Sequence, residues 1–250
     1  MNTNSQKLSN KVALITGASR GIGAAIAKRL AADGASVAIT YSSSPDKADE
    51  VVNAIKAAGG KALAIRADAA DEKAVRAAVT KTVSTFGGID ILVNNAGVAL
   101  MSPIEKFSME DFDKSIAVNV RSVFIATQEA SKHLRDGGRV IHIGSTNSDR
   151  MPFAGGSVYA LTKAAIVGFT KGLARDLAPR QITVNNIQPG PVNTDMNPEN
   201  GPFAESLKSL MALKRYGTGD EIAAMVSYLA SPEAAYVTGA SLLIDGGFAA

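Results

Sequence analysis

Short apolar runs alternate with longer helical patterns along the chain. The apolar runs predict strands at 12–15, 36–40, 61–66, 89–93, 139–143, 182–187 and 241–244. The patterns between them predict helices at 22–32, 45–58, 71–86, 108–134 with a break near 116–119, and 157–177, and then a Pro/Gly-rich loop with short helices over 189–230. Continuous apolar strands separated by helices are typical of a buried parallel sheet. The predicted fold class is therefore α/β, a Rossmann-type doubly wound parallel sheet of about seven strands with helices on both faces.

The segment TGASRGIG, residues 16–23, joins the first predicted strand to the first predicted helix. Gly17 can adopt the backbone angles of a tight turn, and Gly21 and Gly23 remove side chains where a phosphate and the sheet approach the backbone. The helix start directs unpaired N–H groups and the positive end of its dipole at a pyrophosphate. This context predicts dinucleotide binding, with a merely tight strand–helix turn as the alternative.

Composition removes several function classes. The 250 residues include no cysteine, which excludes disulfides and thiolate metal sites. With only two histidines we expect no metal site, and we interpret His142 as a core or interfacial residue and His133 as a helix-surface residue. A net charge of +3 without a long basic run argues against binding a nucleic-acid polymer. No apolar stretch is long enough for a membrane span, and the polar residues 1–10 lack a signal-peptide core, so we expect a frayed lead-in and a cytoplasmic protein.

Polar and small residues follow the predicted strands, at the sheet edge where such folds bind ligands. Asn94-Asn95-Ala96-Gly97 follows the fourth strand, Gly144-Ser145 the fifth, and Pro189-Gly190-Pro191-Val192-Asn193-Thr194 the sixth. Tyr159 and Lys163 lie four residues apart, on one face of a helix. Together with TGASRGIG, Asp68, Asn119 and the ending TGASLLIDGG, this set resembles the short-chain dehydrogenase/reductase family over nearly the whole chain. The resemblance implies a single domain over 1–250 with a substrate lid near 190–215.

The resemblance also implies a catalytic set of Asn119, Ser145, Tyr159 and Lys163. Reduction of a ketone by hydride requires a proton donor at the oxygen, and a free tyrosine with a pKa of about 10 is a poor one near neutral pH. An ammonium one turn away, at Lys163, is expected to lower that pKa, and Ser145 is expected to hydrogen-bond the substrate oxygen. In the family, Lys163 also holds the nicotinamide ribose and Asn119 holds a water that leads to solvent. Taken singly, Tyr159 could instead be a surface aromatic and Lys163 a solvated charge. Ser145 could be a helix cap or turn residue, and Asn119 a buried amide that bonds the backbone.

The residues after the second strand decide between the two nicotinamide cofactors. An acid there binds a ribose 2′-hydroxyl and repels a 2′-phosphate, but the sequence reads TYSSS over 40–44. Arg20 offers a guanidinium fork suited to phosphate, and we therefore expect NADP(H). Asp68 is expected to accept from the adenine amino group, as in the family, or else to cap the helix near 71. The remaining candidate cofactor-binding residues are Gly17, Ser19, Gly21, Ile22, Gly23, Tyr41, Ser42, Ser43, Asn95, Ala96, Gly97, Pro189, Gly190, Val192 and Thr194, together with Tyr159 and Lys163.

Two narrower resemblances favour different functions. The overall pattern is similar to the 3-oxoacyl-acyl-carrier-protein reductases, which implies NADPH-dependent reduction of a 3-oxoacyl thioester or a small carbonyl compound. A basic docking patch for an acidic carrier protein would come partly from Arg175 and Arg180. The segments 144–156 and 188–202 look closer to a bacterial reductase-like protein described as a cyclic-di-GMP-binding biofilm-dispersal factor, with Arg20 and Arg150 as candidate contacts to a second phosphate ligand. We favour the enzyme, because mere binding does not require the catalytic set.

The segments 122–134 and 157–177 carry small and apolar residues on more than one helix face. One face should cover the sheet, and the other needs a partner. Because members of the family usually form tetramers in this way, we expect a homotetramer. The stretch NPENGP at 197–202 is expected to be a mobile lid hinge, or else an ordinary surface loop.

Overall fold

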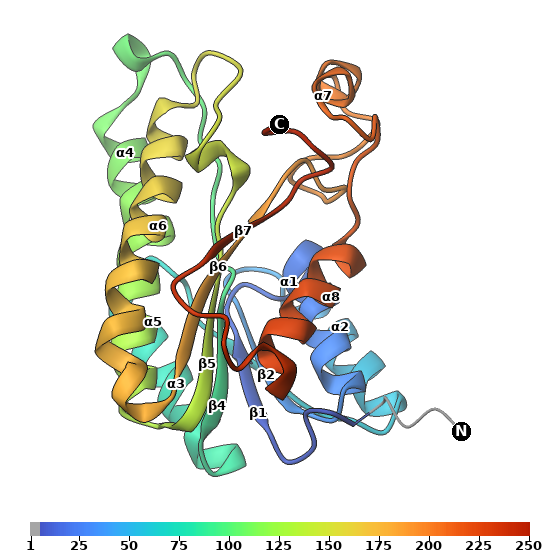
Figure 1. The fold of residues 1–250 in the computed structure, drawn as a ribbon, viewed down its shortest axis with the longest axis vertical. Coiled ribbons are helices and arrows are strands. Elements are labelled where there is room, and N and C mark those ends of the chain that lie inside the picture. Colours follow the sequence, from blue (N-terminus) through green and yellow to red (C-terminus); the bar gives the residue numbers. More distant parts are fainter. Residues whose placement is uncertain (1–5) are drawn as a thin grey trace.

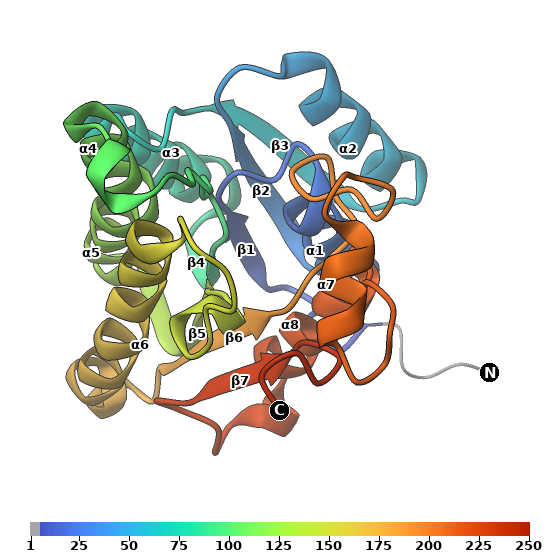
Figure 2. The same cartoon turned by 90° about the horizontal axis from the view of Figure 1, so that it is seen from above.

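Every strand of the central sheet runs parallel to its neighbours. The computed structural model describes residues 6–250. Its seven strands are ordered β3-β2-β1-β4-β5-β6-β7 (Figures 1 and 2). The strands are β1 (Val12–Ile15), β2 (Ser36–Tyr41), β3 (Lys61–Arg66), β4 (Ile89–Asn94), β5 (Leu134–Ile143), β6 (Thr183–Pro189) and β7 (Ser241–Ile244). The order reverses between β1 and β4, which is the switch point of a doubly wound sheet, and the predicted fold class is confirmed.

Helices cover both faces of the sheet (Figure 1). One side carries α1 (Gly21–Ala32), α2 (Pro45–Ala57) and α8 (Gly219–Ala230), and the other carries α3 (Glu72–Phe86), α4 (Met109–Ile116), α5 (Ser122–Ser131) and α6 (Ser157–Leu177). Successive side chains of a strand point to opposite faces, so Ala13 and Ile15 pack in the core under α1 and α8. Leu14 packs in the second core, with Val79 of α3 and Ala174 of α6. Because both faces are covered, all four positions of β1 are apolar and buried.

The helix predicted over 108–134 is continuous but contains a widened turn. α4 passes into a π-helical segment at Ala117–Arg121 and then into α5, which ends at Ser131. The backbone stays right-handed there, with φ −58° and ψ −48° at Ala117, so the predicted break is a bulge within the helix. Such π-bulges are frequent at functional sites. This one contains Asn119, whose side chain is buried.

The strand predicted at 139–143 begins earlier, at Leu134. Leu134 pairs with Ile89, whereas Arg139 pairs with Ile91, so β5 contains extra residues between these two pairs. Gly137, at φ +75°, supplies the left-handed conformation that suits such a bulge. The glycine pair at 137–138 therefore marks an irregularity inside the strand and not the turn before it.

Residues 6–10 are held against the domain. Leu8 is only 1% exposed, and its N–H donates to the carbonyl of Asp33 at 2.8 Å. The expectation of a frayed lead-in is wrong for these residues, because an apolar side chain and a backbone hydrogen bond fix them beside the end of α1. The part of that expectation that concerns residues 1–5 lies outside the described residues.

The segment after β6 contains one short helix before α8. α7 (Ala204–Leu210) begins a small apolar cluster in which Ala204, Met211 and Tyr216 pack against Phe248 near the C-terminus. α8 then opens with a capping box formed by Thr218 and Glu221. Within residues 6–250, no helix is both long enough and apolar enough to cross a membrane.

Candidate active site

The glycine loop after β1 is joined to the loop after β4 by four hydrogen bonds. Thr16 Oγ1 accepts from the backbone N–H of Asn95 at 3.0 Å and of Ala96 at 3.1 Å. The Asn95 side chain donates through Nδ2 to the carbonyls of Thr16 and Gly17, both at 2.9 Å. On its other side the loop is tied to β2, because Gly17 N–H donates to Thr40 Oγ1 at 3.0 Å. The two loops that flank the switch point therefore form one unit.

Close packing explains the glycines of this loop. Gly17 has φ +64°, and a Cβ there would lie 2.8 Å from Ala96 Cα. A Cβ on Gly23 would lie 2.5 Å from Asn95 Nδ2, so the group that approaches this glycine is the Asn95 side chain and not the sheet. Gly21, at φ +54°, lies beside Thr194 in the segment after β6. Each position would be strained or blocked by a side chain.

The start of α1 is free to bind an anion. Arg20 occupies the N-cap position with extended backbone angles, and its side chain makes no capping hydrogen bond. The first turn carries no acidic residue. The N–H groups of the first turn and the positive end of the helix dipole thus meet no competing carboxylate from α1 itself. This arrangement suits a pyrophosphate.

The other predicted cofactor-binding residues differ in exposure. Tyr41 is half-buried, whereas Ser42, Ser43 and Asp68 are exposed at the ends of β2 and β3. Asp68 Oδ1 accepts from the N–H of Ala70 at 2.9 Å, while Asp71 caps α3, so the alternative of Asp68 as the cap of that helix is wrong. Along the loops at the carboxyl edge of the sheet, the half-buried residues are Ser19, Ile22, Ala96, Gly97 and Gly190. Pro189 and Val192 are buried there.

A charge cluster that the sequence did not indicate lies beside Arg20. Asp195 Oδ2 is 2.6 Å from Lys47 Nζ of α2 and 3.8 Å from Arg20 Nη1. The hydrogen bond and the charge of Lys47 hold the pKa of Asp195 below its usual value. All three side chains are about half exposed, so the pairs contribute little to stability. Two cations, Arg20 at the start of α1 and Lys47 in α2, thus lie together beside Asp195.

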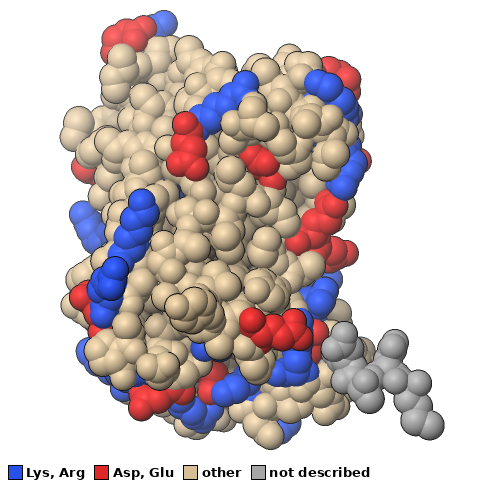
Figure 3. All heavy atoms as spheres, viewed as in Figure 1, with Lys and Arg blue, Asp and Glu red and all other residues tan. Residues whose placement is uncertain are grey.

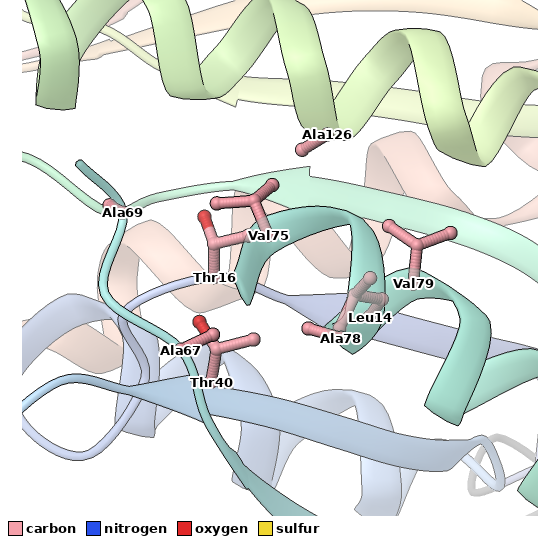
Figure 4. Close-up of a pocket in the computed structure, with 9 residues that line it drawn as sticks. All are labelled: Leu14, Thr16, Thr40, Ala67, Ala69, Val75, Ala78, Val79 and Ala126. Carbon is pink, nitrogen blue, oxygen red and sulfur yellow. The ribbon is translucent and has the colours of Figure 1, made fainter. Parts of the chain in front are cut away.

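A narrow apolar crevice lies behind the glycine loop (Figure 4). It is lined by Leu14, Thr16, Thr40, Ala67, Ala69, Val75, Ala78, Val79 and Ala126, and it holds no more than about one water molecule. Thr16 and Thr40 supply the only oxygens among the side chains drawn, and both hydroxyls accept from the loop backbone. Thr16 and Thr40, which line the crevice, therefore hold the loop from behind, and the crevice itself is too small for a ligand.

Tyr159 and Lys163 lie on α6 next to the end of β5. Lys163 is buried, and its Nζ donates to the carbonyl of Ile143 at 3.0 Å. The same Nζ lies 5.7 Å from the centre of the Tyr159 ring. Burial lowers the pKa of Lys163 to about 8. Its ammonium therefore persists near neutral pH and is lost as the pH rises through that value.

Ser145 both caps a turn and faces Tyr159. Its Oγ accepts from the N–H of Asn147, which caps the 3-10 turn Thr146–Ser148. The alternative of Ser145 as a cap is thus compatible with a role in the site. Burial raises the pKa of the Tyr159 phenol, and the neighbouring Ser145 hydroxyl opposes that shift. This differs from the expectation that Lys163 would lower the pKa of Tyr159, because desolvation of the phenol outweighs the charge-stabilising contacts.

Asn119 bonds the backbone instead of pointing into open space. Its Oδ1 accepts from the N–H of Val98 at 2.8 Å, and its Nδ2 donates to the Val98 carbonyl at 2.9 Å and to Thr162 Oγ1 at 3.1 Å. A Cβ on Gly97 would lie 3.5 Å from Asn119 Oδ1 and 3.6 Å from Lys163 Nζ. Asn119 and Lys163 therefore face the same glycine, at the loop that is joined to Thr16.

His142 and Arg150 both make their contacts inside the fold. His142 is 1% exposed, its Nδ1 lies 3.1 Å from Asn94 Nδ2, and burial together with the Lys163 charge lowers its pKa to about 3, which agrees with a neutral core histidine. Arg150 binds the carbonyls of Phe248 and Ala250, whereas Arg20 faces Asp195, so no contact brings the two arginines to a shared ligand.

Arg180 is likewise held internally. It pairs with Asp136 at 3.0 Å and donates to the carbonyls of Ser131 and Leu134. This reduces the docking patch that was expected from Arg175 and Arg180. Figure 3 shows blue and red side chains interspersed over the face that it draws. Among residues 6–250, no three His, Cys, Asp or Glu side chains are grouped so that they could hold a metal ion.

Comparison with known proteins places the chain in a family. Residues 17–249 match a family described as enoyl-(acyl carrier protein) reductase. The cyclic-di-GMP-binding biofilm dispersal mediator protein of Escherichia coli K12 is 46% identical over 240 residues, 96% of this chain and 98% of that protein. The 3-oxoacyl-[acyl-carrier-protein] reductase of Synechocystis sp. PCC 6803 is 40% identical over 243 residues, 96% of this chain and 97% of that protein.

Solved structures agree with this assignment. A short-chain dehydrogenase/reductase from Serratia marcescens is 60% identical, with a TM-score of 0.97 over 98% of this chain and 100% of that one. A short-chain dehydrogenase from Burkholderia cenocepacia in complex with NADP is 51% identical, with a TM-score of 0.97 and the same coverage of both chains.

Removing the Asn95 side chain should loosen the glycine loop. Asn95→Ala deletes both donors to Thr16 and Gly17 and leaves two partly buried carbonyls unpaired, so we expect the free energy of unfolding in urea to fall by about 1–3 kcal/mol. Asn193→Ala is the matched control, because Asn193 is exposed and accepts one bond from the Glu199 N–H. Equal stability of both variants and wild type would show that these bonds do not hold the loop.

Proposed function

The chain belongs to the short-chain dehydrogenase/reductase family, and we propose that it is an NADPH-dependent oxidoreductase that reduces a 3-oxoacyl thioester or a small carbonyl compound. The observation that carries the proposal is the convergence of Ser145, Tyr159 and a buried Lys163 beside the loop that is joined to the glycine turn. Mere nucleotide binding would not require a phenol, a hydroxyl and a buried ammonium at this edge of the sheet.

The residues of the groove fit NADPH. The glycines at 17, 21 and 23 and the uncapped start of α1 would hold the pyrophosphate, and Arg20 would hold the 2′-phosphate. Residues 40–45, at the end of β2 and after it, carry no acid, and the nearby Asp195 carboxylate is paired with Lys47 and Arg20. The Burkholderia relative in complex with NADP supports this choice. When bound, NADPH would supply the hydride for reduction of the carbonyl carbon.

In this proposal Tyr159 donates a proton to the substrate oxygen. Burial raises its pKa, so the phenol is protonated near neutral pH and can act as a general acid in the direction of reduction. Ser145 would hydrogen-bond the same oxygen. The Lys163 ammonium would stabilise the phenolate left after proton transfer, and would hold the nicotinamide ribose. Asn119 would fix the loop at Gly97 and Val98 against Lys163, and from that position could hold the water of a proton path.

A second candidate function comes from one relative. The Escherichia coli protein that is 46% identical is named for binding cyclic-di-GMP, and the exposed cations Arg20 and Lys47 could meet a dinucleotide phosphate. A screen of NADPH oxidation against ketones and acyl thioesters, run beside calorimetry with cyclic-di-GMP, separates the two. Turnover supports the enzyme. Absence of turnover together with tight cyclic-di-GMP binding would favour the binder.

We also propose a single domain over 1–250 in which 190–215 acts as a substrate lid. The bridge between Val192 and Gly217 and the packing of Met211 on Phe248 support a lid attached at both ends. The absence of cysteine fits a reducing compartment such as the cytoplasm.

The phenol is tested by Tyr159→Phe, which keeps the ring and removes the hydroxyl. We expect kcat for the best carbonyl substrate of the screen to fall at least about 10²-fold, the usual scale for general acid catalysis. NADPH affinity should be nearly unchanged. Tyr236→Phe, at a fully exposed position, is the control and should behave as wild type. Near-normal turnover by Tyr159→Phe would show that Tyr159 is not the proton donor.

The cofactor preference is tested by dissociation constants of NADPH and NADH. A charge-assisted hydrogen bond to the 2′-phosphate contributes about 1.5–3 kcal/mol, or roughly 10- to 100-fold in affinity, which Arg20→Ala should lose for NADPH alone. Ser42→Asp should go further, because it adds a like charge beside the phosphate. Arg175→Ala, exposed on α6, serves as the control. Equal binding of both cofactors by wild type, or an unchanged ratio in Ser42→Asp, would refute the placement of this pocket.

We propose that the assembly is a homotetramer formed through α5 and α6. Ile116, Val120, Arg121, Phe124, Ala165, Ile166 and Phe169 line an apolar groove between these helices. Phe124 and Leu161 are about half exposed, which a partner would cover. Light scattering at micromolar concentration should give a tetramer, and Phe124→Glu should lower the mass. A clean wild-type monomer would contradict the proposal.

A further inference from the structure

The hydroxyl of Ser145 both donates to and accepts from one residue, Asn147. A serine hydroxyl has one hydrogen to donate and two lone pairs that accept. The backbone N–H of Asn147 donates to Ser145 Oγ at 3.1 Å, and Ser145 Oγ donates to Oδ1 of the Asn147 side chain, also at 3.1 Å. The single hydrogen of Ser145 is therefore directed at Asn147.

The surroundings of Asn147 fix which end of its amide faces Ser145. Its Nδ2 lies 3.4 Å from the carbonyl of Arg150 and 3.4 Å from Met151 Sδ, and both of these atoms accept hydrogen bonds. If the amide were reversed, Oδ1 would face the Arg150 carbonyl and two acceptors would meet. The oxygen of Asn147 therefore points to Ser145.

We propose that Asn147 is a positioning residue that competes with Tyr159 and with the substrate oxygen for the one hydrogen of Ser145. The proposal deepens the proposed function, and rests on it for the part of Ser145 at the substrate oxygen. The Ser145 hydroxyl has one hydrogen, which Asn147 Oδ1 already accepts, so a second acceptor can bind it only by weakening or replacing that bond. We take Tyr159 as the second acceptor, because α6, which carries it, packs against the turn Thr146–Ser148, and because the neighbouring Ser145 hydroxyl favours the ionised phenol and so lowers its pKa.

The competition has a direction. With the Asn147 oxygen removed, the Ser145 hydrogen is released to the Tyr159 oxygen, which stabilises the phenolate and lowers the pKa of Tyr159. With a carboxylate in place of the amide, the hydrogen is held more tightly and the pKa of Tyr159 rises. As a result, reduction, which needs the protonated phenol, should fail at a lower pH in the first variant and at a higher pH in the second.

The charged groups around the pair are unchanged in Asn147→Ala, whereas Asn147→Asp adds a carboxylate of its own. Lys163 faces Tyr159 from α6. The loop itself carries Asp149 and Arg150, and Arg150 is bound to the carbonyls of the C-terminal residues. From the C-terminal segment, Asp245 accepts from Thr146 Oγ1 at 3.1 Å. Because Asn147→Ala changes no charge, a shift in that variant reports the hydrogen bond alone.

The direct test is a titration of the Tyr159 phenol by absorbance near 295 nm, taken as the difference between each protein and the same protein carrying Tyr159→Phe. We expect Asn147→Ala to lower the midpoint by about 0.5–1 pH unit, the size of one neutral hydrogen bond, and Asn147→Asp to raise it. In a Ser145→Ala background, Asn147→Ala should leave the midpoint unchanged, because no hydroxyl remains to compete for.

Ser148→Ala is the matched control in the same loop. Ser148 bonds the carbonyl of Ser145 and not its hydroxyl, so this variant should not move the midpoint. Circular dichroism over the same pH range checks that each protein stays folded. If Asn147→Ala does not fold, Asn147→Leu, which keeps the side-chain volume, replaces it. An unchanged midpoint in the alanine or leucine variant, or the same shift in the Ser145→Ala background, would overturn the proposal.

Kinetics with ethyl acetoacetate, a soluble 3-oxo ester, and NADPH give a second measurement. A freed Ser145 hydrogen should bind the ketone oxygen better, so Asn147→Ala should lower KM about 2- to 10-fold and change kcat less, while Asn147→Asp should raise KM. A merely structural role would lower kcat in both variants without this split, and would count against the proposal. Failure of wild type to reduce any carbonyl compound would refute the proposed function, while the titration would still test Asn147.

Discussion

The site depends on the hydrogen bonds that join the glycine loop after β1 to the loop after β4. Thr16 and Gly17 provide the groups of the first loop, and Asn95 and Ala96 those of the second. β1 and β4 are neighbours at the switch point, and their loops would otherwise diverge. The four bonds hold the loops together, and Gly17 and Gly23 permit the approach because neither has a Cβ. On one side the unit leads into the start of α1, whose uncapped N–H groups suit a pyrophosphate. The other side carries Gly97, which faces Lys163 and Asn119.

Burial, more than charge, decides the protonation of Tyr159 and Lys163. Desolvation disfavours the charged form of each group, so it raises the pKa of Tyr159 and lowers that of Lys163 to about 8. The consequence is a neutral phenol beside a lysine that is still charged at neutral pH. That pair is suited to giving a proton to a developing alkoxide, and the ammonium stabilises the phenolate only after the transfer. Ser145 modulates this balance, and its own hydrogen is shared with Asn147.

Much of the fold could be predicted from local pattern, and the partners of the site residues could not. The strand at 241–244 and the helix at 157–177 have the bounds that their apolar periodicity predicts. The bulge at Gly137 was missed because a glycine pair before an apolar run looks like a turn. Leu8 was missed because a single apolar residue in a polar stretch carries no periodic signal. The contacts of Asp195 with Lys47 and of Arg150 with Phe248 join residues far apart in sequence, so only the folded chain shows them.

The central claim is that this groove passes a hydride from NADPH to a carbonyl carbon. The most direct test mixes the protein with NADPH that carries deuterium at both C4 positions of the nicotinamide and with a panel of ketones and 3-oxoacyl thioesters, and follows the products by mass spectrometry. The account predicts that deuterium appears on the carbinol carbon of at least one alcohol product. The contradicting result is an absence of deuterium from every product while the same preparation binds cyclic-di-GMP tightly.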